Sequence, residues 1–323
     1  MRTRVLGKDL QVSAVGFGCM GISHAYGEPM EKSEAVKLLR QAVECGYTFF
    51  DTAECYIGEN SNNEEIVGEA LAPFKGKEQI ATKFGVRNEN RVIVTDSRPE
   101  TIRKSVEGSL KRLRVEYIDL YYQHRVDPKI PAEEVAGVMA ELIKEGKITH
   151  WGISEVTEEY LRKAHAVCPV TAIQNRYSMM FREYEKLFPV LEELNVGFVA
   201  FSPLANGFLS AKYNSNEQFG GAKDYRGAMP QFQNGAYEQN AALIKLLNDM
   251  AAKRNTTTVQ IALAWLIGKK PYIVPIPGTT KYERMKENAK ASEVGLTESE
   301  IVDIDVALNN MQMSAVFGGH ATK

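Results

Sequence analysis

The chain has 323 residues, of which 44% are hydrophobic and 25% are charged, a composition typical of a folded globular protein. Its 39 basic and 41 acidic residues give a formal net charge of −2, without the basic excess expected of a nucleic-acid-binding protein. The composition also excludes a disordered protein, a collagen-like fibre and a small disulfide-rich scaffold.

The sequence also indicates where the protein works. It contains no run of about 18 apolar residues, so we expect no membrane helix. Residues 1–10 lack the apolar core of a signal peptide. The cysteines have neither Cys-x-x-Cys nor metal-ligand spacing, and they are Cys19, Cys45, Cys55 and Cys168. We therefore expect reduced thiols, no metal site and a cytoplasmic enzyme.

Short apolar runs alternate along the chain with segments of helical periodicity. In chain order the sequence predicts a hairpin that turns at 6–10, a strand at 14–18, a helix at 32–45, strands at 48–51 and 80–83, a helix at 99–113, a strand at 117–123, a helix at 132–145, a strand at 148–153, a helix at 159–166 after Thr157, strands at 172–174 and 197–201, helices at 241–254 and 259–268, and a strand at 273–277. Eight strands alternating with helices fit an α/β fold, the (β/α)8 TIM barrel. No linker divides the chain, so we expect one domain over residues 1–323.

Two segments carry no predicted helix or strand. Residues 204–240, after the seventh strand, are polar and rich in Gly, Asn and Gln, which is typical of a lid or binding loop. The tail after Asn310 is expected to be loosely held.

Residues 16–21 match the G-x-G-x-x-G pattern of dinucleotide-binding folds, as Gly-Phe-Gly-Cys-Met-Gly. In a Rossmann fold a helix begins at the last of these glycines, whereas residues 22–29 predict a loop. We therefore favour a glycine-permissive strand end and loop.

Polar residues stand at the ends of seven predicted strands, where a barrel gathers its reactive groups. They are Asp51 with Tyr56 beyond it, Lys83, His124, Ser154 with Glu155, Gln174 with Asn175, Ser202, and the turn at 278–281. Each alone is compatible with a structural role, such as a turn cap at Asp51 or packing at Tyr56. Together they favour a reactive site.

Asp, Tyr, Lys and His on adjacent strands make a proton-donating site. A free phenol has a pKa of about 10, and a nearby ammonium group lowers it. We expect Lys83 to act on Tyr56 in this way, while Asp51 keeps the lysine charged. His124 would orient a substrate oxygen or share the proton. The matching reaction is proton donation to a carbonyl oxygen while hydride arrives at carbon, which requires a nicotinamide cofactor.

With these residues the sequence resembles the aldo-keto reductase superfamily over essentially its whole length. The stretches that carry the resemblance are FDTAECY at 50–56, ATKF at 81–84, DLYYQHRVDP at 119–128, GIS at 152–154, Gln174, FSPLA at 201–205 and PIPGT at 275–279. The resemblance implies that Tyr56 donates the proton, Asp51 and Lys83 tune it, and His124 orients the carbonyl.

The resemblance also implies an NADPH (NADP+) site. Ser154 and Gln174 match the carboxamide contacts, and Glu155 stands where the family commonly has Asn. Ser202, Leu204 and Gly207 match the pyrophosphate side. The far end of the cofactor is expected at the turn of Gly278 and the following helix, with Glu287 and Asn288 toward the adenine.

The resemblance places the binding site for the 2′-phosphate of NADPH near the start of that helix. Thr279 or Thr280 caps a helix N-terminus that attracts phosphate, and Lys281 and Arg284 share one face. The alternative is a plain capping box from Thr280 to Glu283, with the basic pair in solvent.

The expected partner is a small carbonyl compound, bulky or aromatic, in a pocket built from Met20, Tyr26, Ile57, Phe84, Arg125 and parts of 204–240. Arg125 either attracts an acidic substituent or pairs with Asp127. One alternative function is a nucleotide-binding sensor or regulatory member of the same family. A barrel hydrolase or isomerase is disfavoured, because no His-rich metal set or second carboxylate pair is present. No nucleic-acid or membrane partner is expected, and the oligomeric state stays open.

Overall fold

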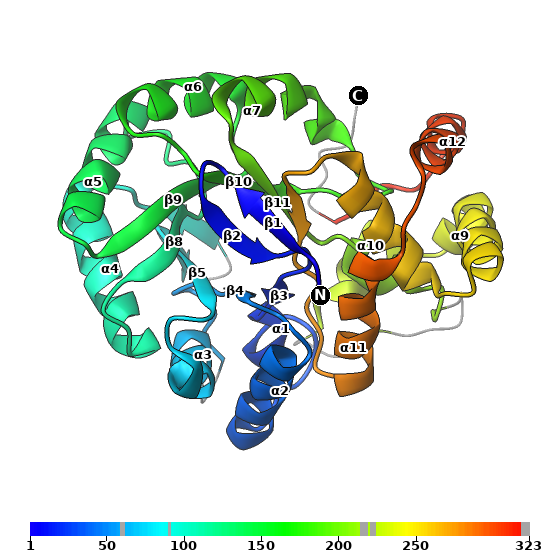
Figure 1. The fold of residues 1–323 in the computed structure, drawn as a ribbon, viewed down its shortest axis with the longest axis horizontal. Helices are drawn as coiled ribbons and strands as arrows, with labels where there is room; N and C mark the ends of the chain where they lie inside the picture. Colours follow the sequence, from blue (N-terminus) through cyan, green and yellow to red (C-terminus); the bar gives the residue numbers. More distant parts are fainter. Residues whose placement is uncertain (59–61, 90–91, 214–218, 220–223, 318–323) are drawn as a thin grey trace.

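The computed structural model describes residues 1–58, 62–89, 92–213, 219 and 224–317, with backbone only at 88 and 89. Its centre is a parallel eight-stranded sheet ringed by helices (Figure 1). The strands are β3 (Phe17–Gly18), β4 (Phe49–Asp51), β5 (Gln79–Phe84), β8 (Ile118–Gln123), β9 (Ile148–Ser154), β10 (Ala172–Arg176), β11 (Gly197–Phe201) and β12 (Ile273–Pro275). All eight predicted strands are confirmed.

The first and last strands of this sheet meet and close it. Gly16 N donates to Pro275 O over 2.9 Å, and Gly18 N donates to Pro277 O over 3.4 Å. The sheet order runs from β12 through β11, β10, β9, β8, β5 and β4 to β3. This order, with helices outside, confirms the (β/α)8 barrel.

Gly18 of the G-x-G-x-x-G pattern and Gly278 after β12 allow this closure. A Cβ on Gly18 would lie 2.7 Å from Ile276 O, and one on Gly278 would lie 2.6 Å from Gly18 O. Only glycine allows the two backbones to approach so closely. The barrel topology excludes a Rossmann unit, although one short helical turn, α1 (Met20–Ser23), stands where we expected the loop to begin.

The barrel helices alternate with the strands. They are α2 (Lys32–Glu44), α3 (Asn63–Leu71), α4 (Pro99–Leu113), α5 (Ala132–Lys144), α6 (Glu158–Val167), α7 (Phe188–Leu194), α10 (Thr258–Lys269) and α11 (Tyr282–Lys290), with α9 (Ala241–Arg254) and α12 (Glu298–Asn309) outside α10. The predicted helices are confirmed within two residues at each end. The sequence analysis missed α3, α7 and α12. A capping box of Thr297 and Glu300, visible in the sequence, begins α12.

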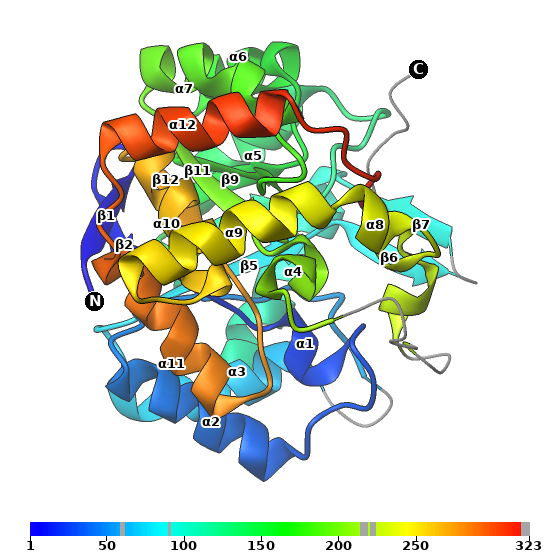
Figure 2. The same cartoon turned by 90° about the vertical axis from the view of Figure 1, so that its right-hand side faces the viewer.

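The predicted N-terminal hairpin closes one end of the barrel. It pairs β1 (Thr3–Leu6) with β2 (Leu10–Ser13). Leu6, Leu10 and Val12 are buried against residues from inside the barrel. Figure 2 shows this hairpin at one end and β6 (Val86–Glu89), β7 (Val92–Thr95) and α8 (Ala236–Gln239) at the other. The sequence analysis missed the β6–β7 hairpin. Because the β1–β2 hairpin covers one end of the barrel, only the other end, at the carboxyl ends of the strands, can open to a ligand.

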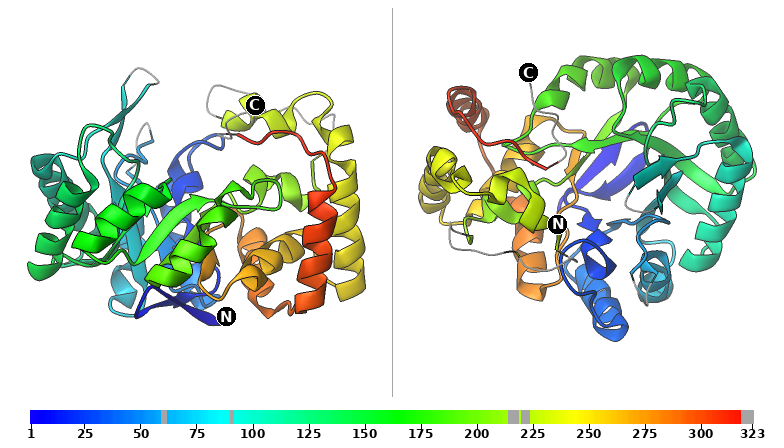
Figure 3. Two further views of the ribbon diagram at one scale, coloured as in Figure 1. Left: turned by 90° about the horizontal axis from the view of Figure 1, so that it is seen from above. Right: turned by 180° about the vertical axis from the view of Figure 1, so that it is seen from behind.

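The segment 204–240 and the tail are more ordered than predicted. The described part of the segment forms short helical turns, η3 (Ala205–Ser210), η4 (Tyr225–Ala228), η5 (Pro230–Phe232) and α8. The tail returns over this segment (Figure 3), where Ser314 N donates to Asn240 Oδ1 and Phe317 N donates to Gln231 Oε1. The expectation of a loosely held tail is therefore wrong for residues 311–317. Residues 214–218, 220–223 and 318–323 lie outside the described part.

None of the described helices combines the length and hydropathy needed to span a bilayer. The described residues also contain no group of three His, Cys, Asp or Glu side chains arranged to hold a metal ion.

Candidate active site

A buried ion pair lies at the carboxyl ends of β4 and β5. Lys83 Nζ donates to Asp51 Oδ1 over 2.5 Å and to the carbonyl oxygen of Thr52 over 2.7 Å. It also lies 3.5 Å from the hydroxyl oxygen of Tyr56. Lys83 is fully buried and Asp51 is 3% exposed. The predicted chain from carboxylate to ammonium to phenol is therefore formed.

The pKa of Tyr56 differs from the sequence prediction. Burial raises the pKa of this phenol to about 12, although the charge of Lys83 acts to lower it. The expected net lowering is wrong because desolvation outweighs the ammonium group. Tyr56 is thus protonated at neutral pH, as a proton donor must be.

His124 follows β8 and faces Tyr56. The two rings meet edge to face with centroids 5.9 Å apart, and Cys55 Sγ lies 3.5 Å from His124 Nδ1. Burial, together with the charges of Lys83 and Arg125, holds the pKa of His124 well below its usual value. The imidazole is therefore neutral and able to donate one hydrogen bond.

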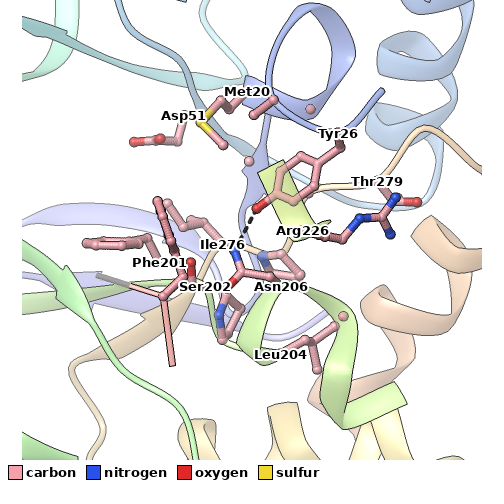
Figure 4. A pocket seen from close by; sticks show the side chains of 18 of the residues that line it. Met20, Tyr26, Asp51, Phe201, Ser202, Leu204, Asn206, Arg226, Ile276 and Thr279 are labelled. Carbon is pink, nitrogen blue, oxygen red and sulfur yellow. Dashed lines mark hydrogen bonds between the residues drawn. The ribbon is translucent and has the colours of Figure 1, made fainter. Parts of the chain in front are cut away.

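A cavity of about 380 Å³ opens above these groups. Figure 4 shows Met20, Tyr26, Asp51 and Phe201 around it, with Asn206 Nδ2 donating to the Tyr26 hydroxyl over 2.8 Å. The predicted residues on its wall are Met20, Tyr26, Asp51, Tyr56, His124, Arg125, Ser154, Gln174, Ser202, Leu204, Gly207, Gly278, Thr279, Thr280, Arg284, Glu287 and Asn288. The strand ends thus bring distant parts of the sequence to one site.

Four predicted residues lie off this wall: Lys83, which is fully buried in the ion pair with Asp51, and three others. Ile57 is 59% exposed, because its side chain points outward from the loop after Tyr56. Phe84 is fully buried and packs on Tyr121 with ring centroids 5.0 Å apart. Lys281 is exposed at the start of α11. The pocket assignments of Ile57 and Phe84 are corrected accordingly.

Two predicted cofactor contacts already have protein partners. Gln174 Nε2 donates to Asp51 Oδ2 over 2.7 Å, so this amide also holds the carboxylate of the ion pair. Arg125 Nη1 donates to Ser154 Oγ over 3.1 Å. Arg125 does not pair with Asp127, whose carboxylate accepts from the backbone of Ser97 and Lys129. That alternative is excluded.

The loop after β11 turns tightly along the cavity. Ser202, Ala205 and Asn206 have φ of 50°, 47° and 59°, and Gly207 has φ of 100°. Successive residues of this kind turn backbone N–H groups toward a concave surface, a form that suits phosphate oxygens. Lys212 Nζ of this segment lies 3.2 Å from Glu287 Oε2 on α11, so the segment crosses the cavity.

The start of α11 differs from the predicted capping box. The helix N-cap is Lys281, and its backbone N donates to Thr279 Oγ1 over 3.1 Å. Thr280 therefore lies outside the helix, and the Thr280–Glu283 box does not form. Among the described residues, the side chains of Lys281 and Arg284 have no hydrogen-bonding or ionic partner. Arg284 on the cavity wall is thus available to a phosphate group.

The wall includes residues that the sequence analysis did not name: Arg176 and Phe317, and also Asn206 and Arg226, which lie in the segment 204–240 that was expected to contribute to the pocket. Arg176 was missed because the predicted strand stopped at Gln174, whereas β10 continues to Arg176. Arg226 lies in the segment after β11, where no periodic pattern was available to place it. Phe317 reaches the cavity only because the tail folds back.

The closed (β/α)8 barrel thus carries an Asp–Lys–Tyr cluster and a neutral histidine at its strand ends, the set that the sequence analysis expected of a carbonyl reductase. The model of the Aldo/keto reductase family matches residues 14–309, and the chain belongs to this family. It is accordingly an oxidoreductase.

Similar proteins agree with this membership. The chain is 40% identical over 307 residues to the probable aldo-keto reductase 1 of Glycine max, covering 92% of this chain and 86% of that protein. The glycerol dehydrogenase AKR11B4 from Gluconobacter oxydans superposes with a TM-score of 0.86 at 30% identity, over 99% of each chain. The aldo-keto reductase AKR11C1 from Bacillus halodurans, solved in a holo form, superposes with a TM-score of 0.79 at 27% identity over 100% of each chain.

Proposed function

We propose that this protein reduces an aldehyde or ketone to the alcohol, with NADPH as hydride donor and Tyr56 as proton donor. The observation that carries the proposal is the contact of Tyr56 with the buried Lys83–Asp51 pair at the wall of the cavity. A phenol in this setting has its proton at neutral pH and a cation beside the phenolate that forms when the proton leaves.

The protein's own groups would act on the carbonyl oxygen. Tyr56 donates its hydroxyl proton to that oxygen, and Lys83 stabilises the negative charge left on the phenol. Neutral His124 donates a hydrogen bond to the same oxygen and orients it. Bound NADPH would supply the hydride that reaches the carbonyl carbon.

The cavity residues fit a nicotinamide dinucleotide. Ser154 and the carbonyl of the Gln174 amide would hold the carboxamide, and the loop of Ser202, Leu204 and Gly207 would hold the pyrophosphate. Arg284, without a described ionic partner, would hold the 2′-phosphate, with Lys281 adding charge from outside. This arrangement supports NADPH over NADH.

Steady-state assays test the proposal directly. Purified protein is mixed with aromatic and aliphatic aldehydes and ketones, with NADPH or NADH, and the nicotinamide absorbance is followed. We expect turnover of aromatic aldehydes with NADPH. If NADPH binds but no carbonyl compound is turned over, the alternative of a nucleotide-binding sensor replaces the enzyme.

The extent of the domain and its location are part of the same proposal. Because residues 16–18 pair with residues 275–277, nearly the whole described chain is needed to close one barrel, which supports a single domain over 1–323. The four cysteines are all unpaired, which supports a reducing, cytoplasmic setting.

A further inference from the structure

Two arginines lie on the cavity wall at the ends of β8 and β10, the strands on either side of β9. Arg125 follows His124 after β8, and Arg176 is the last residue of β10. Arg125 is partly buried and Arg176 is 7% exposed. A buried guanidinium is expensive unless something pairs with it, so its partner must be identified.

Within the part of the chain that the structure describes, Arg176 has no ionic partner. Its guanidinium carbon lies 5.3 Å from the ring centroids of both Phe181 and Phe201. Among the described residues it makes no side-chain hydrogen bond and no ion pair, and Glu155 and Glu183, whose charges act on it, are not within 4 Å. The N–H donors of this side chain that face the cavity can therefore bind a molecule there.

Arg125 is only partly satisfied by its neighbours. Nη1 donates to the carbonyl oxygen of His124 over 2.6 Å and to Ser154 Oγ over 3.1 Å. Its guanidinium carbon lies 6.0 Å from the ring of Phe201, which Arg176 also approaches. Two cations therefore lie against one aromatic ring, and no carboxylate of the described residues is in contact with either.

This arrangement has an electrostatic cost that a ligand would remove. Burial lowers the pKa of Arg176, and the charge of Arg125 lowers it further, whereas Glu155 acts to raise it. The charge of Arg125 also acts on Tyr56 and His124, and Arg176 lines the same cavity. An anion between the two guanidiniums would offset both the desolvation and the repulsion.

We propose that Arg125 and Arg176 form a binding site for an anionic group of the substrate, so that the preferred substrates are carbonyl compounds bearing a carboxylate or a phosphate. The inference rests on the proposed reductase function and adds the class of substrate. The two guanidiniums would hold the charged end while Tyr56 and His124 hold the carbonyl oxygen.

The test compares matched aldehydes at fixed NADPH. The acids are 3- and 4-carboxybenzaldehyde and 4-formylphenyl phosphate, and the neutral controls are the methyl esters of the two carboxybenzaldehydes. We expect kcat/KM to be at least about tenfold higher for an acid than for its ester, as one charge-assisted hydrogen bond gives. A preference for the carboxylates or for the phosphate identifies which anion the site takes.

Variants assign the preference to these residues. Arg176→Met should reduce the acid-to-ester ratio toward one while leaving the ester rate and the Kd of NADPH within about twofold, and Arg176→Lys should restore part of the ratio. Arg182→Met is the matched control, because Arg182 lies just beyond β10 and contacts Asn309 rather than the cavity. It should leave the ratio unchanged.

The experiment distinguishes failure of the proposed reductase function from failure of the proposed anion site. If neither acids nor esters are reduced, the reductase function is wrong. If esters are reduced as fast as acids by the wild-type protein, the anion site is wrong while the reductase stands, whether or not the variants fold. If Arg176→Met weakens NADPH binding and both substrate types equally, Arg176 binds the cofactor and the anion site is overturned.

Discussion

At the scale of single residues, the site depends on a buried lysine whose positive charge is balanced by the carboxylate of Asp51. Lys83 is fully buried, and three oxygen atoms surround its ammonium group. Gln174 holds the second oxygen of Asp51, so the carboxylate is satisfied on both sides. Such a network keeps its geometry because removing either charged member leaves the other as an unpaired buried charge.

Replacing the proposed proton donor tests this network. Tyr56→Phe keeps the aromatic ring that packs against His124 but removes the hydroxyl group. The rate of carbonyl reduction should therefore fall by about 10²–10⁴-fold. Turnover is measured by steady-state kinetics, and NADPH binding, measured by fluorescence, should remain nearly unchanged. A variant that retains more than about a tenth of wild-type turnover would assign proton donation to another group.

At the scale of elements, the cofactor site is divided between the loop after β11 and the first turns of α11. The helix N-terminus carries partial positive charge, and Arg284 adds a full one on the cavity wall. NADPH and NADH differ only by the 2′-phosphate, so only groups near that phosphate can distinguish them.

Arg284→Ala should therefore weaken NADPH binding by at least about tenfold and NADH binding little. The preference of the wild-type protein should also shrink as salt rises, because Arg284 is exposed and its attraction is screened. Titration of both cofactors at two ionic strengths measures this. Lys290→Ala, at the other end of α11, is the control, and an equal loss for both cofactors would mean that Arg284 only supports the helix.

The segment 204–240 should respond to the cofactor. Lys212 forms an ion pair with Glu287, and Asn206 donates a hydrogen bond to Tyr26. All four residues line the cavity in which we propose that the cofactor binds. We expect NADPH to slow tryptic cleavage within this segment, because a ligand that binds the closed form reduces opening. Fragments are followed by mass spectrometry with and without NADPH. Equal cleavage rates in both samples would exclude the proposed lid.

At the scale of the whole molecule, stability depends on how the ends of the barrel are filled. Glu78 stands at the bend before β5, at the end opposite the site, and is 9% exposed. Its Oε2 has no hydrogen-bond partner among the described residues. Burial raises the pKa of this carboxyl to about 7, so the folded state binds the proton more tightly than the unfolded chain.

The sign of the resulting pH effect follows from linkage. The contribution of Glu78 to stability is complete below its ordinary pKa of 4.5 and is lost as the pH rises to about 7. Glu78→Gln removes this loss, and it should raise the thermal midpoint at pH 8 by about 2 °C, from about 1 kcal/mol of relieved desolvation. The gain should vanish near pH 4.

Calorimetry at the two pH values measures the effect. Glu44→Gln, at an exposed position of α2, should change neither midpoint, and kcat should be unaffected by either substitution. A gain of equal size at both pH values would show that packing, not titration, is responsible.

The local pattern of the chain determined the order of strands and helices and the set Asp51, Tyr56, Lys83 and His124. Apolar runs bounded by polar residues mark strand ends, and parallel strand ends meet at one rim of a barrel. The tertiary structure alone decided that Phe84 is buried, that Ile57 faces outward and that the pKa of Tyr56 rises. It also decided that Arg176 reaches the cavity without an ionic partner among the described residues. These properties depend on which distant segments cover a side chain, because desolvation and pairing are set by neighbours in space and not by neighbours in sequence.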